Sequence, residues 1–289
     1  MRAHLLVAIV CTTAVGFGTT AAGQDQYASG QNVAPVFEGW EPNADGTFNM
    51  VFGYMNRNYE EVLNIAVGPD NSIEPGGPDQ GQPARFFPRR SRFVFRVRVP
   101  KDFGKKELVW TLTAHGRTEK AYGSLRPEYV LDNRVVMMNN GGFGQRGNEA
   151  DNKAPVIHID GDRTRTVKVG QPLTLSAETS DDGIPATKTA VRDGGDGGPV
   201  VTIGGLRAGW IVYRGPGDVS FTPEQFNPEF RSARRSSPLA PRRPPPPLPK
   251  DGKITATATF ATPGVYVLRF VSHDGGLASY EHVTVTVTD

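Results

Sequence analysis

The C-terminal part of the chain alternates apolar and polar positions in three successive runs, at residues 254–260, 265–271 and 281–287. The apolar positions fall on one face of each run: Ile254, Ala256, Ala258, Phe260, Tyr266, Leu268, Phe270, Val283, Val285 and Val287. Thr-Pro-Gly at 262–264 and His-Asp-Gly-Gly at 273–276 separate the runs. A period of two between turn residues is typical of half-buried antiparallel strands. The pattern predicts a β-sandwich, in which two sheets pack face to face.

A second alternating region covers residues 33–132, with runs at 47–54, 63–67, 92–99, 107–113 and 117–125. The positions predicted to point inward are Phe48, Met50, Phe52, Tyr54, Leu63, Ile65, Val67, Phe93, Phe95, Val97, Val99, Leu108, Trp110 and Leu112. Residues 68–90 are rich in Pro, Gly, Asp and Asn, so we expect a loop without regular structure there. Five to seven strands without helical periodicity predict a further all-β domain.

The first residues indicate the compartment. Arg2 precedes an apolar run at 5–17, and small residues at 19–23 form a cleavage zone, so residues 1–23 are predicted to be a signal peptide. The run is shorter than the ~20 apolar residues of a spanning helix. Cys11 is the only cysteine, which leaves a mature chain without disulfides or thiolate metal sites. We expect a periplasmic or extracellular protein with no stable membrane insertion after signal cleavage.

The predicted order is a signal peptide at 1–23, a β-sandwich at 33–132, a flexible linker at 133–153 and a second sandwich at 154–289. Residues 139–153 lack apolar periodicity and favour disorder, which indicates the linker. Long loops are expected at 186–209 and 222–253, where Gly/Asp-rich and Arg/Pro-rich stretches interrupt the second pattern.

An ordered set of motifs runs through the second half: NKAPVIHI at 152–159, VKVGQPLTLSA at 167–177, SDDGIP at 180–185, Trp210, GPGDVSF at 215–221, Pro263-Gly264 before Tyr266, and Asp274-Gly275. This set resembles the PKD-like family of immunoglobulin-like domains found in bacterial surface and secreted proteins. Trp210 is placed as the buried aromatic of a central strand, and Tyr266 as the residue that ties a corner to the backbone. Asp274-Gly275 suits a tight hairpin turn. The first half resembles an uncharacterised exported bacterial module, which implies no activity.

No catalytic residue or cofactor is predicted. The mature histidines are His115, His158, His273 and His282, and none has a metal-binding or catalytic-motif spacing. His158 and His282 fall at outward strand positions. The Glu60-Glu61 pair is expected to point to opposite faces of a strand, so the two carboxylates cannot act together. We therefore expect a protein that is not an enzyme.

Asp181, Asp182 and Asp274 form a candidate calcium site. The loops that carry them lie at the same end of an immunoglobulin-like sandwich, and calcium prefers several carboxylate and carbonyl oxygens. The resemblance also implies calcium, because some PKD-like domains bind it. The simpler alternative is that these residues serve turn geometry. Asp193 and Asp196, in a glycine run, are a weaker candidate.

Two basic features are ambiguous. The first is an arginine cluster that an anionic polysaccharide, lipid headgroup or nucleic acid could meet: Arg85, Arg89, Arg90, Arg92, Arg96 and Arg98. A solvated charged face, neutralised by Asp70, Glu74 and Asp79, is the favoured interpretation. The second is the Arg/Pro-rich loop 231–250, whose prolines at 244–247 favour polyproline II and suit either an aromatic groove or a spacer role.

The sequence thus predicts an exported, non-catalytic binding or structural protein of the bacterial envelope or extracellular space. Its expected partner is a protein or polysaccharide of the envelope, and not nucleic acid. The alternatives are a calcium-dependent adhesion or carbohydrate-binding module and, less favoured, a hydrolase with a dispersed site.

Overall fold

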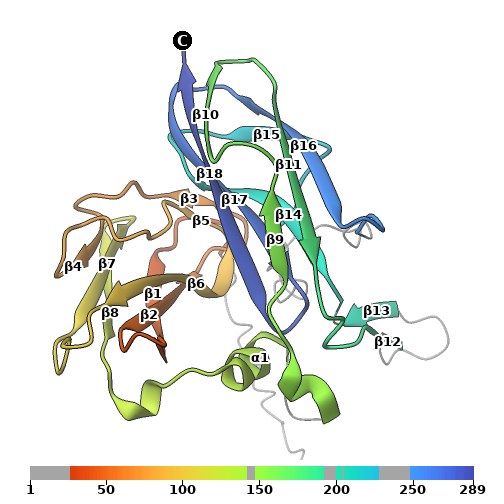
Figure 1. Ribbon diagram of the computed structural model, residues 1–289. Helices are drawn as coiled ribbons and strands as arrows, with labels where there is room; N and C mark the ends of the chain where they lie inside the picture. Colours follow the sequence, from red (N-terminus) through yellow and green to blue (C-terminus); the bar gives the residue numbers. More distant parts are fainter. Residues whose placement is uncertain (1–26, 142–146, 192–199, 204, 228–247) are drawn as a thin grey trace, which may run out of the picture.

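The computed structural model describes residues 27–141, 147–191, 200–203, 205–227 and 248–289 (Figure 1). The predicted signal peptide, the Asp193/Asp196 run and most of the Arg/Pro-rich loop 231–250 lie outside the described residues. Within the described ranges, no helix has the length and apolar character needed to cross a membrane. The chain folds into β-sheets, which confirms the predicted all-β class.

The first half of the chain, here called the N-terminal unit (residues 33–123), contains two three-stranded sheets and one short strand pair. One sheet has the order β1-β2-β6, with bounds Val33–Pro42, Phe48–Asn56 and Arg89–Val99. The other has the order β4-β7-β8, with bounds Asn71–Glu74, Leu108–Ala114 and Arg117–Gly123. The short pair joins β3 (Leu63–Asn64) to β5 (Arg85–Phe86).

Aromatic side chains fill the space between the two N-terminal sheets. Trp110 of β7 is fully buried, and Phe95 of β6 meets it edge-on at 4.9 Å between ring centroids. Phe52 of β2 lies 5.9 Å from the same indole. These contacts confirm the inward positions predicted for β2, for β7 and for the second half of β6. An interior of this size stabilises the unit mainly by removing apolar surface from water.

Phe93 departs from its predicted position. The register between β2 and β6 shifts opposite Gly53, and Phe93 has a positive φ of 53°. This bulge turns the Phe93 side chain to the outer face of its sheet, where it packs with Val51. A bulge inserts extra residues on one strand and breaks the alternation on which the prediction depended.

The expectation of a structureless loop at 68–90 was wrong, because this segment contains β4 and β5. Its polar side chains replace the missing apolar pattern. The Asn71 side chain is fully buried, donates to the carbonyls of Ile65 and Pro83, and accepts a hydrogen bond from the Trp110 indole at 3.0 Å. Gln82 is also fully buried. Hydrogen bonds of this kind allow polar residues to organise an interior.

The second half, here called the C-terminal unit (residues 156–288), is a sandwich of two four-stranded sheets. One sheet has the order β15-β16-β11-β9, with bounds Val219–Thr222, Lys253–Phe260, Leu173–Ser180 and Val156–Ile159. The other has the order β10-β18-β17-β14, with bounds Thr164–Lys168, Ala278–Thr288, Gly264–His273 and Arg207–Arg214. The three predicted C-terminal strands are confirmed as β16, β17 and β18, and the chain changes sheet between β16 and β17.

Two aromatic residues occupy their predicted places in the C-terminal unit. Trp210 of β14 is 1% exposed and packs edge-on against Phe270 at 5.1 Å. The Tyr266 hydroxyl donates to the Thr262 carbonyl at 2.9 Å and so ties the corner before β17. A side chain at Gly215 would collide with the Tyr266 ring, which explains a glycine there.

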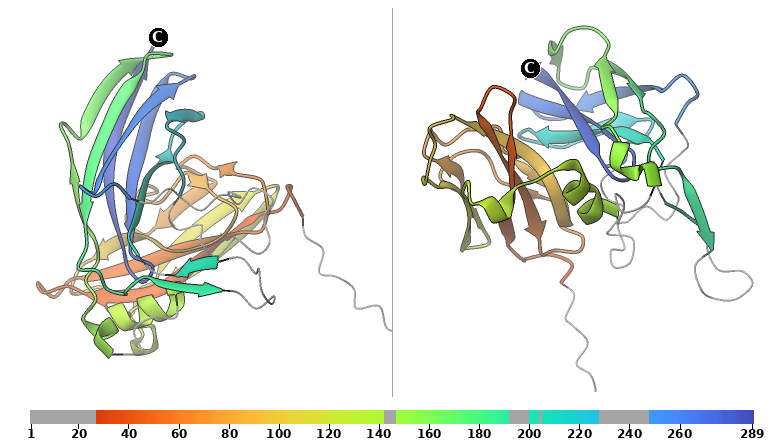
Figure 2. Two further views of the ribbon diagram at one scale, coloured as in Figure 1. Left: turned by 90° about the vertical axis from the view of Figure 1, so that its right-hand side faces the viewer. Right: turned by 60° about the horizontal axis from the view of Figure 1, so that its bottom comes forward.

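The predicted loop 186–209 contains a hairpin. β12 (Lys188–Val191) pairs with β13 (Val200–Ile203), and β14 already begins at Arg207. Figure 2 shows this hairpin reaching away from the sandwich. The Gly/Asp-rich composition of the stretch concealed the two short β-branched runs on either side of it.

The predicted linker 133–153 also contains regular structure. It carries α1 (Asn133–Gly141) and the 3₁₀ turn η2 (Gly147–Asp151), and another such turn, η1 (Pro127–Tyr129), comes before it. Asp132 caps α1, because its carboxylate accepts a hydrogen bond from the Val135 amide at 2.8 Å. Met137 of α1 is fully buried. The expectation of a linker without regular structure was therefore wrong for its described part.

Candidate functional site: the junction between the two sandwiches

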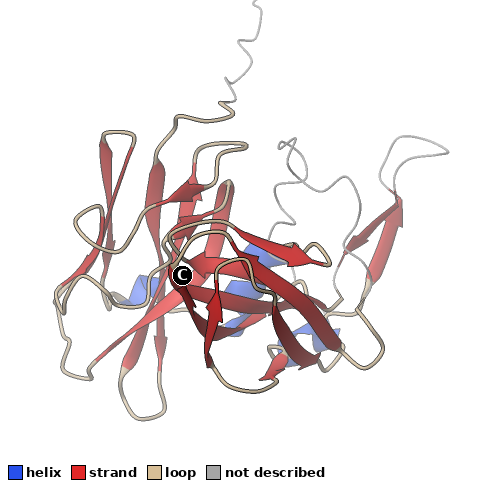
Figure 3. Cartoon of the chain, turned by 90° about the horizontal axis from the view of Figure 1, so that it is seen from above, coloured by secondary structure: helices blue, strands red, loops and turns tan. Residues whose placement is uncertain are grey.

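The two units lie side by side (Figures 1 and 3). β14, at the edge of its sheet, meets the N-terminal segment 79–85. The Ala84 amide donates to the Tyr213 carbonyl at 3.2 Å, and the Tyr213 hydroxyl donates to the Gly81 carbonyl at 2.6 Å. Arg214 forms two bonds with the Asp79 carboxylate, at 2.8 and 3.0 Å. Hydrogen bonding from Arg214 lowers the pKa of Asp79. One backbone hydrogen bond, from Ala84 to Tyr213, and the side-chain contacts around it fix the relative position of the units along the strand.

Arg269 forms the polar centre of the junction. It is 2% exposed, although it lies at an outward position of β17. Its guanidinium donates to the Val94 carbonyl of β6 at 2.7 Å and to His282 Nε2 at 2.9 Å. The same group lies over the rings of Tyr213 and Tyr280, at 3.7 and 4.5 Å from their centroids. The N-terminal unit thus covers a charged side chain of the C-terminal unit.

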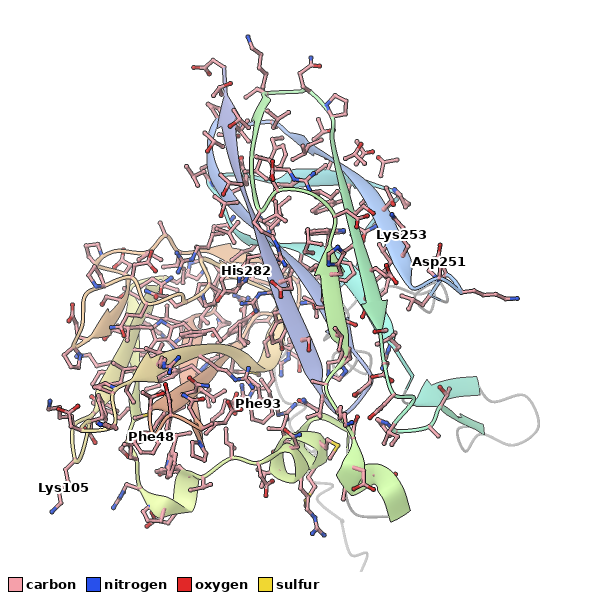
Figure 4. All side chains as sticks on the ribbon, in the orientation of Figure 1. Phe48, Phe93, Lys105, Asp251, Lys253 and His282 are labelled. Carbon is pink, nitrogen blue, oxygen red and sulfur yellow. The ribbon has the colours of Figure 1, made fainter. Side chains whose placement is uncertain are left out.

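His282 belongs to this centre, and Figure 4 labels it on β18. It accepts a hydrogen bond from Arg269, so its Nε2 carries no proton. His282 keeps an exposed surface, but the neighbours packed around its ring remove water from it; this desolvation, followed by the positive charge of Arg269, lowers the pKa of His282 to about 3. The sequence predicted an outward strand histidine, and gave no sign of this neighbour because it comes from the adjacent strand.

An apolar cluster continues the junction below Arg269. It joins the outer face of the β1-β2-β6 sheet to α1 and to the β17–β18 turn, and its buried members are Val51, Phe93, Leu131, Val136, Met137 and Leu277. Figure 1 shows α1 beneath both units. The covered apolar face explains why β2 carries Val51 on the side opposite its own core.

The segment 133–153 contacts the β17–β18 turn through buried hydrogen bonds. Asp274 is fully buried, and its Oδ1 accepts hydrogen bonds from the amides of Gly276 and Leu277. Asn152 of the linker donates to Asp274 Oδ2 at 3.1 Å, and the Asn140 side chain of α1 donates to the Gly276 carbonyl. Burial raises the pKa of Asp274 to about 6. The residue predicted at an exposed turn tip is instead a buried acceptor.

The three candidate calcium ligands do not all converge. The structure places Asp181 close enough to Asp274 for its charge to raise the pKa of Asp274. Asp182, by contrast, accepts from the amides of Lys153 and Ile184, which engages both of its oxygens. Among the residues that the structure describes, no three acidic, histidine or cysteine side chains could hold a metal ion. Asp182 thus serves backbone geometry, in line with the simpler alternative, and calcium binding stays a prediction.

The arginine cluster is largely paired within the N-terminal unit. Arg90 and Arg96 bind Glu38 and Glu41 of β1 through two bonds each, all between 2.7 and 2.8 Å. Three other members have partners too: Arg98 pairs with Asp45, Arg85 with Asp218, and Arg89 stacks on Tyr59. The expected neutralisers Asp70, Glu74 and Asp79 do not make these bonds. β1 supplies the acids, because it lies across β2 from β6 in the same sheet.

The remaining titratable candidates are dispersed. His115 lies 3.2 Å from Glu61, and His158 lies 4.0 Å from Asp160 on an exposed strand. His273 Nδ1 accepts from the Gly275 amide. The three histidines thus occupy separate environments, and none shares one with His282.

A groove of about 620 Å³ opens between β10 and β11, lined by Asp160, Arg165, Thr174 and Ser176 among others. Its charged groups are already engaged. Arg165 donates to the carbonyls of Asp160, Asp162 and Thr174, and Asp160 accepts from Ser176 and pairs with Lys253. The groove is therefore held together by its own polar side chains.

Comparisons with known proteins give only weak structural likenesses. No protein family and no curated protein matches the sequence. The solved D00-D0 domains of intimin align over 88% of this chain and 99% of that chain, at 12% identity and a TM-score of 0.25. Domains 4 and 5 of the S-layer protein SbsC align over 64% and 66%, at 10% identity and a TM-score of 0.23. Sidekick-1 immunoglobulin domains 1–5 align over 89% of this chain and 40% of that chain, at 10% identity and a TM-score of 0.23.

The chain thus spans less than two thirds of the SbsC and Sidekick-1 chains. Likenesses this weak carry no argument about activity. The strand order of the two C-terminal sheets is consistent with an immunoglobulin-like β-sandwich.

Proposed function

We propose that this is an exported, non-catalytic binding or structural protein, whose two sandwiches act as one rigid body with a PKD-like C-terminal unit. The junction around Arg269 is the observation that carries the proposal. One hydrogen bond between backbones, several from side chains, a stacked guanidinium and an apolar cluster hold the units in a single orientation. A fixed orientation suits a protein that presents surfaces to a partner, since rigid display lowers the ordering cost of binding.

The surfaces available for such display lie away from the junction. The β12–β13 hairpin reaches out from the C-terminal unit (Figure 2). Projecting loops on a rigid sandwich are common positions for recognition. The paired arginines of β6 leave little free positive charge for nucleic acid, so we propose a protein or polysaccharide of the bacterial envelope as the partner.

Export and binding can be tested together in the native host. The tagged full chain is expected in the periplasmic or extracellular fraction, cross-linked to an envelope component. A variant in which Arg214 is replaced by Glu, which opposes Asp79 at the junction, should retain export but lose most of the cross-link. R163E is the matched control, because Arg163 makes a surface ion pair within the C-terminal unit.

The opposite results are equally clear. Retention of the chain in the cytoplasm would refute export. Release of products from purified envelope polysaccharide or peptide by the wild-type chain would refute the non-catalytic role. Binding to isolated polysaccharide, with no protein cross-link, would favour the carbohydrate-binding alternative, which stays a prediction.

A further inference from the structure

His282 offers an oriented N–H group at the rim of the junction. Arg269 donates through Nε to His282 Nε2 at 2.9 Å. Arginine has no acceptor atom, so Nε2 is the unprotonated ring nitrogen and Nδ1 carries the hydrogen. Tyr213 lies against the ring, with the two centroids 5.0 Å apart, yet His282 as a whole is exposed. Its imidazole therefore presents a neutral N–H donor on the side away from Arg269.

The charge around this donor is positive. In the described structure Arg269 has a carbonyl and an imidazole as hydrogen-bond partners, and not a carboxylate. Arg214 and Arg163 also bring positive charge close to the imidazole. Asp79 and Glu281 pair with these two arginines, which leaves the charge of Arg269 in excess. An anion at Nδ1 would accept the hydrogen and offset that charge.

A strip of threonine hydroxyls runs from His282 along the outer face of β18 and β10 (Figure 1). Thr284 and Thr286 lie on the same face as His282, since alternate residues share a face and the valines between them are buried in the core. The register places Thr164 beside Thr284 and Thr166 beside Thr286. At ~3.3 Å per residue, the strip extends ~13 Å from His282 to Thr286. It is long enough to contact more than one unit of a polymer.

The neighbouring strand β17 shows where this strip becomes open. Val267, beside Thr284, packs against the core of the N-terminal unit. Val265, beside Thr286, is 59% exposed. Threonine hydroxyls donate and accept hydrogen bonds, as sugar hydroxyls do. An exposed apolar side chain next to them suits a sugar ring, which has C–H groups on its faces and hydroxyls at its edge.

We propose that the outer face of β10 and β18 binds an acidic polysaccharide, whose carboxylate accepts from His282 Nδ1 beside Arg269 and whose hydroxyls bond to the threonine strip. A membrane surface is recognised by a wider group of basic residues, and two of the three arginines here are already paired. The inference rests on the proposed function, because it names the class of envelope polymer that the protein binds.

Isothermal titration calorimetry on the chain purified from its native host tests the site. The probe is hexagalacturonate, and maltohexaose is the neutral control of the same length. At pH 7 in 50 mM salt, the wild type should bind hexagalacturonate at least about ten-fold more tightly than maltohexaose. Binding of the acidic sugar should weaken at least about three-fold in 500 mM salt, because salt screens the attraction.

Substitutions on the strip separate binding from folding. H282F removes the N–H donor and should weaken hexagalacturonate binding about ten-fold. H282Q keeps an acceptor for Arg269 and an N–H donor, so its affinity should stay within about three-fold of the wild type. T286E adds a like charge and should also weaken binding about ten-fold. T257E is the matched control, since Thr257 lies half-buried on the outer face of the other sheet, and it should leave binding unchanged.

Three results would overturn the site. These are equal binding of both hexasaccharides, no hexagalacturonate binding by the folded wild type, and wild-type affinity in T286E. Binding to phosphatidylglycerol vesicles without binding to hexagalacturonate would overturn it in favour of a membrane. Far-UV circular dichroism checks that each variant folds, and T286E carries the test if H282F does not.

Failure of this site can be told apart from failure of the proposed function. Absence of hexagalacturonate binding, with export and cross-linking intact, would remove the acidic-polysaccharide site alone. Retention in the cytoplasm would refute export and leave the calorimetric result unchanged.

Discussion

Replacing Arg269 with methionine tests whether the junction is a rigid part of the fold. Methionine keeps the apolar stem and removes the guanidinium, and with it the bonds to the Val94 carbonyl and to His282. It also removes the two ring contacts, of which the Tyr213 contact at 3.7 Å is the closer. The Val94 carbonyl, at the edge of β6, then lacks its donor.

The expected change in unfolding free energy of R269M is a balance of opposing contributions. A desolvated cation–π contact contributes about 2 kcal/mol, and a hydrogen bond to a charged group about 1.5–3 kcal/mol. Against this, burying an arginine without a carboxylate costs several kcal/mol, which methionine does not incur. Among the residues that the structure describes, the hydrogen-bond partners of Arg269 are a carbonyl and an imidazole and not a carboxylate, so the balance is modest. We expect R269M to lose about 3 kcal/mol of unfolding free energy.

Urea unfolding at pH 7.5, followed by tryptophan fluorescence and by far-UV circular dichroism, measures this loss. The wild type should show coincident transitions, and R269M should show separate ones, because the units no longer unfold together. R163M is the matched control. Arg163 pairs with Glu281 on the surface, where ion pairs contribute about 0–1 kcal/mol. Coincident R269M transitions within 1 kcal/mol of the wild type would refute the rigid junction.

Three other predictions follow from single contacts. N71A should lose about 3 kcal/mol in urea unfolding, because the Trp110 indole and two carbonyls lose their partner, whereas a loss under 1 kcal/mol would contradict this role. Y266F should lose about 1 kcal/mol, since only the bond to the Thr262 carbonyl disappears; an unchanged midpoint would show that the bond is not needed. His282 has a folded pKa of about 3, below its unfolded value of 6.5, so its contribution is lost as pH falls from 6.5 towards 3. H282Q should therefore gain stability relative to the wild type at pH 4.5 compared with pH 7.5, and a constant difference would contradict the shift.

The alternation of apolar and polar residues was enough to predict strands that have one face in the core and the other towards solvent. β16, β17 and β18 appear where their period-two runs predict them, with Leu268 and Phe270 fully buried. The places of Trp210 and Tyr266 were predicted differently, from the ordered motifs that resemble PKD-like domains. In each case the residue and its local neighbours contain the information.

Positions at the junction could not be predicted, because their partners come from the other unit. Arg269 lies between Leu268 and Phe270, so alternation places it outward, and only the presence of β6 buries it. The prediction for Phe93 was wrong because a β-bulge in β6 turns its side chain from the inner to the outer face of the sheet. The strands within 68–90 were not predicted because buried residues there, such as Asn71, are polar and give no apolar alternation.

The same buried polar groups explain how this chain fixes one orientation between its units. An apolar face such as that of Val51 and Met137 provides affinity but tolerates small shifts, because contact between apolar side chains is not directional. Arg269 and Asp274 accept few geometries, since displacement would leave buried hydrogen-bonding groups unsatisfied. Because Cys11 is the single cysteine of the chain, an internal disulfide cannot supply that precision. The directional contacts at the junction therefore select the orientation of the two units. The apolar cluster contributes most of the free energy that holds them together.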